Sequence, residues 1–164
     1  MTIQSRKIIR KFVIRPTGNT SPYADGDALH TDPIEIEHAV QKQPGSGCVI
    51  DVSVLDVDGV GAALSILFFN ADPAESTVTI NDALAIHAND RNKLLGKVDI
   101  TAASYSLAGA DKLARAQQVV TLETPKVDGA ILRTDSIFVV VVINGTPTYT
   151  TTTPLEITIG IEQD

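Results

Sequence analysis

The sequence predicts an all-β fold, an antiparallel β-sandwich with jelly-roll connectivity, and three observations predict it. First, residues 137–143 form an unbroken run of seven apolar side chains, which is typical of a strand buried on both faces. Second, residues 155–162 alternate strictly between apolar and polar side chains, which is typical of a strand with one wet face. Third, about nine strand patterns recur at intervals of roughly ten to fifteen residues, with turn residues between them.

The strand patterns follow one another along almost the whole chain. In order, they cover residues 8–15, 34–40, 50–54, 64–69, 98–102, 117–122, 130–132, 137–143 and 155–162. Glycine, proline, asparagine and aspartate separate them, chiefly at residues 17–22, 24–27, 43–47 and 56–59. Helix is expected only in the 81–95 region, as one or two short turns capped by Asn81 and by Asn89 and Asp90.

The length and composition indicate one globular domain. The chain has 164 residues, of which 43% are apolar and 20% charged, and no linker or repeat divides it. We expect a basic N-terminal strand or arm over residues 1–20 and a single β-sandwich domain over residues 21–164. The longest apolar run is far shorter than the ~20 residues that span a bilayer, and no signal-peptide pattern opens the chain. Cys48, which begins a strand as a small buried side chain, excludes an internal disulfide and is compatible with a reducing cytosol.

Charge is distributed unevenly along the chain. The net charge is −7, but residues 1–24 contain no acidic side chain and carry +5, so the remainder carries −12. An acidic body disfavours nucleic acid as a partner. The basic segment is either an edge strand protected from unwanted pairing or an arm that docks on an acidic surface of another protein. The candidate partner contacts in it are Arg6, Lys7, Arg10, Lys11 and Arg15.

The patterns that usually carry chemistry are missing from the sequence. The three histidines, His30, His38 and His87, do not have the spacing of a compact metal site, and His38 falls on the apolar face of the 34–40 pattern. No nucleophile elbow, P-loop or dinucleotide motif is present. The acidic turns at residues 25–27 and 56–58 are fragments of calcium-binding loops and are expected to be ordinary turns. We therefore predict no catalytic, metal-binding or cofactor-binding residues.

Tyr149 is a further candidate contact. It lies in the threonine-rich segment 146–154, between the two strongest strand patterns. A single aromatic side chain there either plugs the core or anchors an interface, and replacement by alanine distinguishes the two outcomes.

The order of several motifs resembles a family of small structural proteins of tailed-bacteriophage virions. The matching stretches are residues 23–27, 45–47, 64–70, 72–73, 81–83, 95–98, 146–150 and 155–162. The resemblance covers most of residues 20–164, and its motifs consist of turn and strand residues.

What the resemblance implies is a non-enzymatic virion protein, made in the host cytoplasm and located on the capsid surface. Decoration (cement) proteins of this kind bind the major capsid protein and are commonly trimers, whose several attachment points hold firmly even when each contact is weak. The alternatives are a tail- or fibre-associated protein or a carbohydrate-binding jelly roll, and, third, a β-sandwich enzyme. The absence of tryptophan, with three tyrosines and four phenylalanines, weighs against sugar binding.

Overall fold

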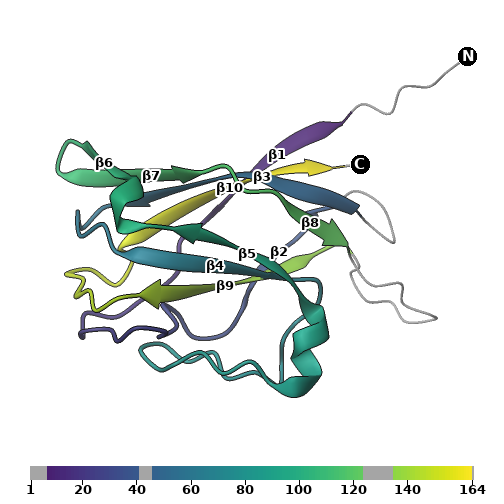
Figure 1. The fold of residues 1–164 in the computed structure, drawn as a ribbon, viewed down its shortest axis with the longest axis horizontal. Helices are drawn as coiled ribbons and strands as arrows, with labels where there is room; N and C mark the ends of the chain where they lie inside the picture. The colour runs from purple at the N-terminus through teal and green to yellow at the C-terminus, as the bar shows by residue number, and fades with distance from the viewer. Residues whose placement is uncertain (1–6, 41–45, 124–134, 164) are drawn as a thin grey trace, which may run out of the picture.

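The computed structural model describes residues 7–40, 46–123 and 135–163, which form two antiparallel β-sheets packed face to face (Figure 1). The strands of the larger sheet are β1 (Ile8–Ile14), β3 (Ser46–Asp56), β6 (Tyr105–Ala108), β7 (Asp111–Ala116), β8 (Val120–Glu123) and β10 (Leu155–Gln163). Their order is β1-β10-β3-β7-β6, with β8 also paired to β3. The long strand β3 pairs with β8 through its first half and with β7 through its second.

The smaller sheet contains the strands β2 (Ile34–Ile36), β4 (Ala63–Phe69), β5 (Leu94–Ile100) and β9 (Ile137–Asn144). Their order is β2-β9-β4-β5. Two short 3-10 helices, η1 (Ala88–Lys93) and η2 (Ala102–Ser104), precede and follow β5. The prediction of an all-β antiparallel fold is confirmed, while jelly-roll connectivity stays a prediction.

Strand β9 is apolar along its length because both of its faces are covered. Val139, Val141 and Ile143 point into the main core between the two sheets, whereas Val140 and Val142 belong to a second apolar cluster on the opposite face of the smaller sheet. Leu84 and Ile86, from the segment between β4 and β5, cover that second cluster. In Figure 1 this segment lies below the smaller sheet, on the side away from the larger one.

Strand β10 alternates because only one of its faces meets the core. Ile157, Ile159 and Ile161 are fully buried between the sheets, while Glu156 and Glu162 lie on the half-exposed outer face. Both of the strongest strand predictions are therefore confirmed in type and in burial.

The middle of the chain departs from the sequence predictions at two places. Residues 81–87 form isolated bridges instead of a helical turn, with Ala83 paired to Asp27 and Ala85 to Thr77. The second expected turn is confirmed as η1, but the predicted caps are wrong: the N-cap is His87, whose ring accepts from Asn89 N–H, and Asn89 and Asp90 lie within the helix. The hairpin of β6 and β7 was not predicted, because most of its side chains are exposed or small and show no alternation. The strand expected at residues 130–132 lies outside the described residues.

The second strand is shorter than predicted. It ends at Ile36, and His38 takes up a left-handed conformation with φ 57° and an exposed side chain. The expectation that His38 lies on the apolar face of a strand is therefore wrong. A turn at residues 37–38 redirects the chain, and the backbone oxygens of His38 and Ala39 accept hydrogen bonds from the buried Gln163 amide at 2.8 and 2.9 Å.

Candidate partner-binding surface

Strand β1 forms one outer edge of the larger sheet. Its seven residues pair with β10 in unbroken antiparallel register, from Ile8 opposite Gln163 to Ile14 opposite Ile157. No strand among the described residues pairs with its other edge. Of the two forms expected for the basic N-terminal segment, residues 8–14 thus take the form of an edge strand that belongs to the sandwich (Figure 1).

Two basic side chains at the ends of β1 form ion pairs with β10. Lys7 Nζ lies 2.5 Å from Glu162 Oε1, and Arg15 Nη2 lies 2.6 Å from Glu156 Oε2. Both cations are largely exposed, so each pair contributes at most about 1 kcal/mol to stability. These two residues are used within the chain and are weaker candidates for a partner contact.

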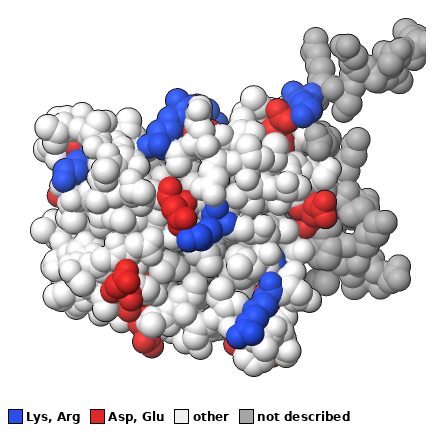
Figure 2. Space-filling view, viewed as in Figure 1, with Lys and Arg blue, Asp and Glu red and all other residues white. Residues whose placement is uncertain are grey.

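The two basic side chains in the middle of β1 are different. Arg10 and Lys11 are exposed and form no ion pair with a described residue. On the face shown in Figure 2, acidic and basic side chains are scattered and form no continuous block of one sign. Arg10 and Lys11 are therefore the two cations of β1 that are available to form an ion pair with another molecule. The remaining candidate, Arg6, lies outside the described residues.

Strand β1 also exposes apolar surface. Ile8, Ile9 and Val13 are 41%, 58% and 49% exposed. The pairing register puts Ile9 and Val13 on the outer face of the sheet, opposite the half-exposed Glu162 and Thr158. Apolar side chains around a basic centre are characteristic of protein interfaces, where charge confers specificity and apolar contact supplies binding energy.

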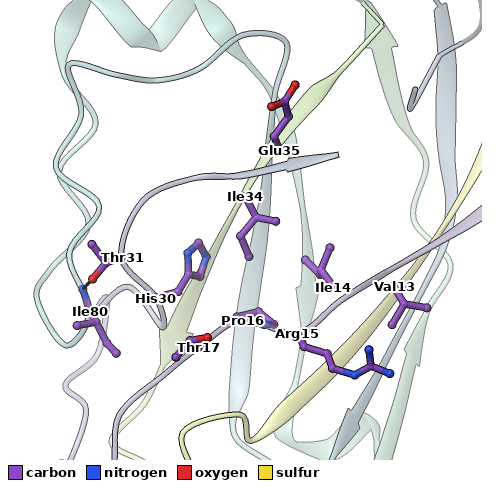
Figure 3. A pocket seen from close by; sticks show the side chains of 10 residues that line it. All are labelled: Val13, Ile14, Arg15, Pro16, Thr17, His30, Thr31, Ile34, Glu35 and Ile80. Carbon is purple, nitrogen blue, oxygen red and sulfur yellow. Dashed lines mark hydrogen bonds between the residues drawn. The ribbon is translucent and has the colours of Figure 1, made fainter. Parts of the chain in front are cut away.

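A groove of about 560 Å³ extends from the end of β1 to β2, the outermost strand of the smaller sheet (Figure 3). In this view Ile14 and Ile34 point toward each other across the groove, while the side chains of Arg15 and Glu35 point away from it. Val13, Pro16 and Ile80 add to the apolar lining, and the Ile80 N–H donates a hydrogen bond of 3.3 Å to Thr31 Oγ1. The groove was not predicted from the sequence, because its walls come from three separate segments.

His30 lies at the wall of this groove with both ring nitrogens occupied. Nδ1 lies 2.8 Å from the Asp32 carbonyl oxygen, and Nε2 lies 3.0 Å from the Val141 backbone nitrogen. A neutral ring that donates from Nδ1 and accepts at Nε2 satisfies both contacts. Burial lowers the pKa of His30, which keeps the ring neutral. His30 thus fastens the chain before β2 to β9, and it has no free nitrogen to offer a ligand.

Tyr149 lies in the core and is only 1% exposed. Its ring meets that of Tyr23 edge to face, with centroids 6.0 Å apart and planes at 72°. Burial raises the pKa of Tyr149, with a further contribution from the Asp56 carboxylate. The burial supports the core-plug alternative, because such a side chain offers no surface to a partner.

The aspartates of the predicted turns bind backbone N–H groups. Asp27 accepts a bond of 2.7 Å from Ala24 N–H, and the fully buried Asp56 accepts from Gly61 N–H at 2.6 Å and Asp58 N–H at 3.0 Å. Burial raises the pKa of Asp56, although these hydrogen bonds oppose the shift. This is turn chemistry, as predicted. Among the described residues, no group of three or more potential metal ligands occurs.

Asp58 fixes the threonine-rich segment that carries Tyr149. Its Oδ2 accepts from the backbone N–H groups of Thr150 and Thr151 at 2.6 and 3.0 Å, and its Oδ1 accepts from the Thr150 hydroxyl at 3.1 Å. Burial acts to raise the pKa of Asp58, but the hydrogen bonds outweigh it and the pKa is lowered. The segment is therefore attached to the turn that follows β3.

Two other residues differ from their sequence-based expectations. The exposed His38 ring forms a hydrogen bond with the Asp135 carboxylate through Nδ1, so it is not a core side chain. Cys48 is only half-buried, whereas a buried position was predicted. The register explains this, because Cys48 lies opposite Glu162 of β10 and Thr121 of β8 on the outer face of the larger sheet.

No protein-family model matches this chain, and no curated protein shows a significant match to it. Among the residues that the structure describes, no helix has both the length and the apolar character needed to cross a membrane. The candidate surface therefore has to be interpreted from its own residues.

Proposed function

We propose that this protein is a non-enzymatic structural protein of a tailed-bacteriophage virion that decorates and stabilises the capsid from outside. The observation that carries the proposal is the edge strand β1, which combines Arg10 and Lys11, two cations that form no ion pair with a described residue, with exposed apolar side chains. A sandwich that has such a strand at its edge is suited to bind another protein. The sequence resemblance to phage virion proteins supplies the identity of that partner, the major capsid protein.

Binding through β1 also agrees with the distribution of charge. The body of the protein is acidic, so an acidic shell surface would repel most of it. The basic strand is the part that such a surface attracts. Attachment of a homotrimer at three points would make weak single contacts sufficient.

The carbohydrate-binding alternative receives no support from the tyrosines. Tyr23 and Tyr149 are buried at 2% and 1% exposure, and Tyr105 is half-buried. None of the three is a fully exposed platform on which a sugar ring could stack. A tail-associated role requires the same inert sandwich, and the protein's copy number in purified virions distinguishes it from a capsid role.

The test is charge reversal in the middle of β1. Arg10→Glu combined with Lys11→Glu should weaken attachment to shells stripped of this protein by about tenfold or more, because two attractive contacts become repulsive. Shell occupancy is measured by quantitative gel analysis after sedimentation, and folding by circular dichroism.

The control is Arg91→Glu combined with Lys97→Glu, in which Lys97 gives up an exposed ion pair of 3.0 Å with Asp99. This variant changes the net charge by the same amount as the β1 variant. Its two residues lie on η1 and on β5, the strand at the far edge of the smaller sheet from β2. Normal occupancy for the control and reduced occupancy for the β1 variant support the proposal. Unchanged occupancy of a folded β1 variant would contradict docking through this strand.

A further inference from the structure

On the same side of the molecule, each of the two sheets ends in a strand whose outer edge pairs with no other strand in the part of the chain that the structure describes. Strand β1 is terminal in the larger sheet and β2 in the smaller one, and the groove described above lies between them. Such a lateral opening is where an additional strand can enter a sandwich without displacing one already present.

We infer that β1 receives a further β-strand from its partner, an extended acidic segment that places an apolar side chain in the groove. The inference rests on the proposed function only in taking the shell protein as the source of the segment. The mode of binding, addition of a strand to a free edge, follows from the geometry of β1 and its surroundings.

The backbone of β1 is suited to this pairing. An edge strand has a row of N–H and C=O groups directed away from the sheet, and proteins usually block such a row with a bulge, an internal proline, a short strand or charged side chains. In β1 the charged side chains are Arg10 and Lys11, which oppose pairing with a basic strand but attract an acidic one. The register between β1 and β10 has no shift, and the strand is seven residues long. The nearest proline, Pro16, comes after its end. The outer edge is therefore both long and regular.

The groove is suited to an apolar side chain of the incoming strand. Residues of β1 whose side chains point inward, such as Phe12 and Ile14, lie opposite the buried Ile159 and Ile157 of β10. A strand added to the free edge continues the same inner face, so its inward side chains point toward the space between Ile14 and Ile34 in Figure 3. Burial of an apolar side chain there contributes binding energy that charge alone does not give.

The charges determine what kind of strand fits. Arg10 and Lys11 are consecutive, so their side chains lie on opposite faces of the sheet, and an incoming strand meets both when it carries carboxylates on both faces. Antiparallel pairing with β1 of a second copy would bring the same cations close together near the centre of the strand, and like charges oppose such pairing. The occupant is therefore an acidic segment of another protein, and not β1 of a second copy.

The probe that tests this inference is a capped eight-residue peptide, Val-Glu-Val-Glu-Glu-Val-Glu-Val, added to the full chain. Its two consecutive central glutamates shift the alternation, so that a strand formed by it carries carboxylates and valines on both faces. We expect hydrogen exchange, followed by NMR, to slow at the outward-facing amides of β1. Amides of β5, the far edge of the smaller sheet, should be unaffected. The same peptide with lysine in place of glutamate should bind at least about tenfold more weakly, and the Arg10→Glu and Lys11→Glu variant should reverse this preference.

A third peptide separates strand addition from simple attraction between charges. It keeps the glutamates and valines, but alternate backbone nitrogens on the pairing edge are methylated and can no longer donate hydrogen bonds. Loss of binding by this peptide supports strand addition. Equal binding by the methylated peptide, or no protection of β1 at millimolar concentrations of the acidic peptide, would overturn the inference.

These outcomes are independent of the proposed function. Charge reversal that weakens shell attachment, together with a failed peptide experiment, leaves the decoration proposal standing and removes strand addition. Peptide binding with the expected protection, together with normal attachment of the charge-reversed variant, shows a strand-accepting edge that serves another partner.

Discussion

Tyr149 carries a hydroxyl group into the core without giving it a hydrogen-bond partner among the described residues. Its ring packs against Tyr23, whose own hydroxyl accepts from Asn19 N–H at 2.8 Å and donates to the Leu29 carbonyl at 3.2 Å. The ring of Tyr149 therefore stabilises the fold through packing, whereas the oxygen adds little to it. The two contributions can be separated by substitution.

Tyr149→Ala should lower the free energy of unfolding by about 3–5 kcal/mol, because it leaves a ring-sized cavity. Tyr149→Phe should change it by less than about 1 kcal/mol, since it removes only the unpartnered hydroxyl. Urea unfolding followed by circular dichroism measures both values. A large loss for the phenylalanine variant would show that the hydroxyl has a partner that matters.

The short helix η1 depends on one buried carboxylate. Asp90 Oδ2 accepts from the Ser76 hydroxyl at 2.7 Å and from Glu75 N–H at 3.0 Å, while Lys93 Nζ donates to Oδ1 at 2.6 Å. These bonds connect η1 to the loop that follows β4. The Lys93 hydrogen bond, with help from Ser76 and Glu75 and against the effect of burial, lowers the pKa of Asp90 below its ordinary value of 3.8.

A lowered pKa makes this connection sensitive to acid. The stabilisation by the ionised Asp90 carboxylate is fully present above the pKa of 3.8 in the unfolded chain. It is lost as the pH falls through the lower pKa of the folded protein. Asp90→Asn should therefore lower the melting temperature at neutral pH, and its difference from the native chain should shrink below about pH 4. Thermal unfolding across this range measures the effect. Asp25→Asn, which removes an exposed turn carboxylate, is the control. A loss of melting temperature in Asp90→Asn that stays equally large in acid would contradict the prediction.

Elements with strong apolar patterns could be predicted from the sequence, and elements formed by tertiary pairing could not. Strand β9 was predictable because its side chains are apolar on both faces, whatever lies beside them. Residues 81–87 satisfied the local rule for a helix cap, but pairing with residues 27 and 77 outweighed it. The β6–β7 hairpin did leave a signal, the two-residue connection Gly109-Ala110, in which Gly109 has φ 77°.

At the scale of the whole molecule, the candidate site too has features that could be predicted from the sequence and features that could not. Its cations were predictable, because the basic segment stands out from an acidic chain. The groove was not, since Ile14, Ile34 and Ile80 become neighbours only when the edges of two sheets approach each other. The alternatives for Tyr149 also required the folded chain, because its ring partner Tyr23 is far away in the sequence.

The oligomeric state is the prediction that concerns the whole molecule. A decoration protein seated on a three-fold axis should be a trimer, with a mass of about three times 17.4 kDa. Light scattering on the protein as it leaves a sizing column measures this mass. A monomer would contradict a trimer in solution, and would restrict three-fold assembly to the shell surface.

The position of β10 in the larger sheet also determines when the protein can fold during synthesis. Residues 155–163 lie between β1 and β3, so the ribosome must add them before β1 can pair with any described strand. Until then the nascent chain carries β1 without its strand neighbour, whereas β9 already has its own neighbours, β2 and β4, earlier in the chain. Pairing of Ile14 with Ile157 also closes a very long loop, which slows folding. We therefore expect the larger sheet to be completed late, only after residues 155–163 have been synthesised.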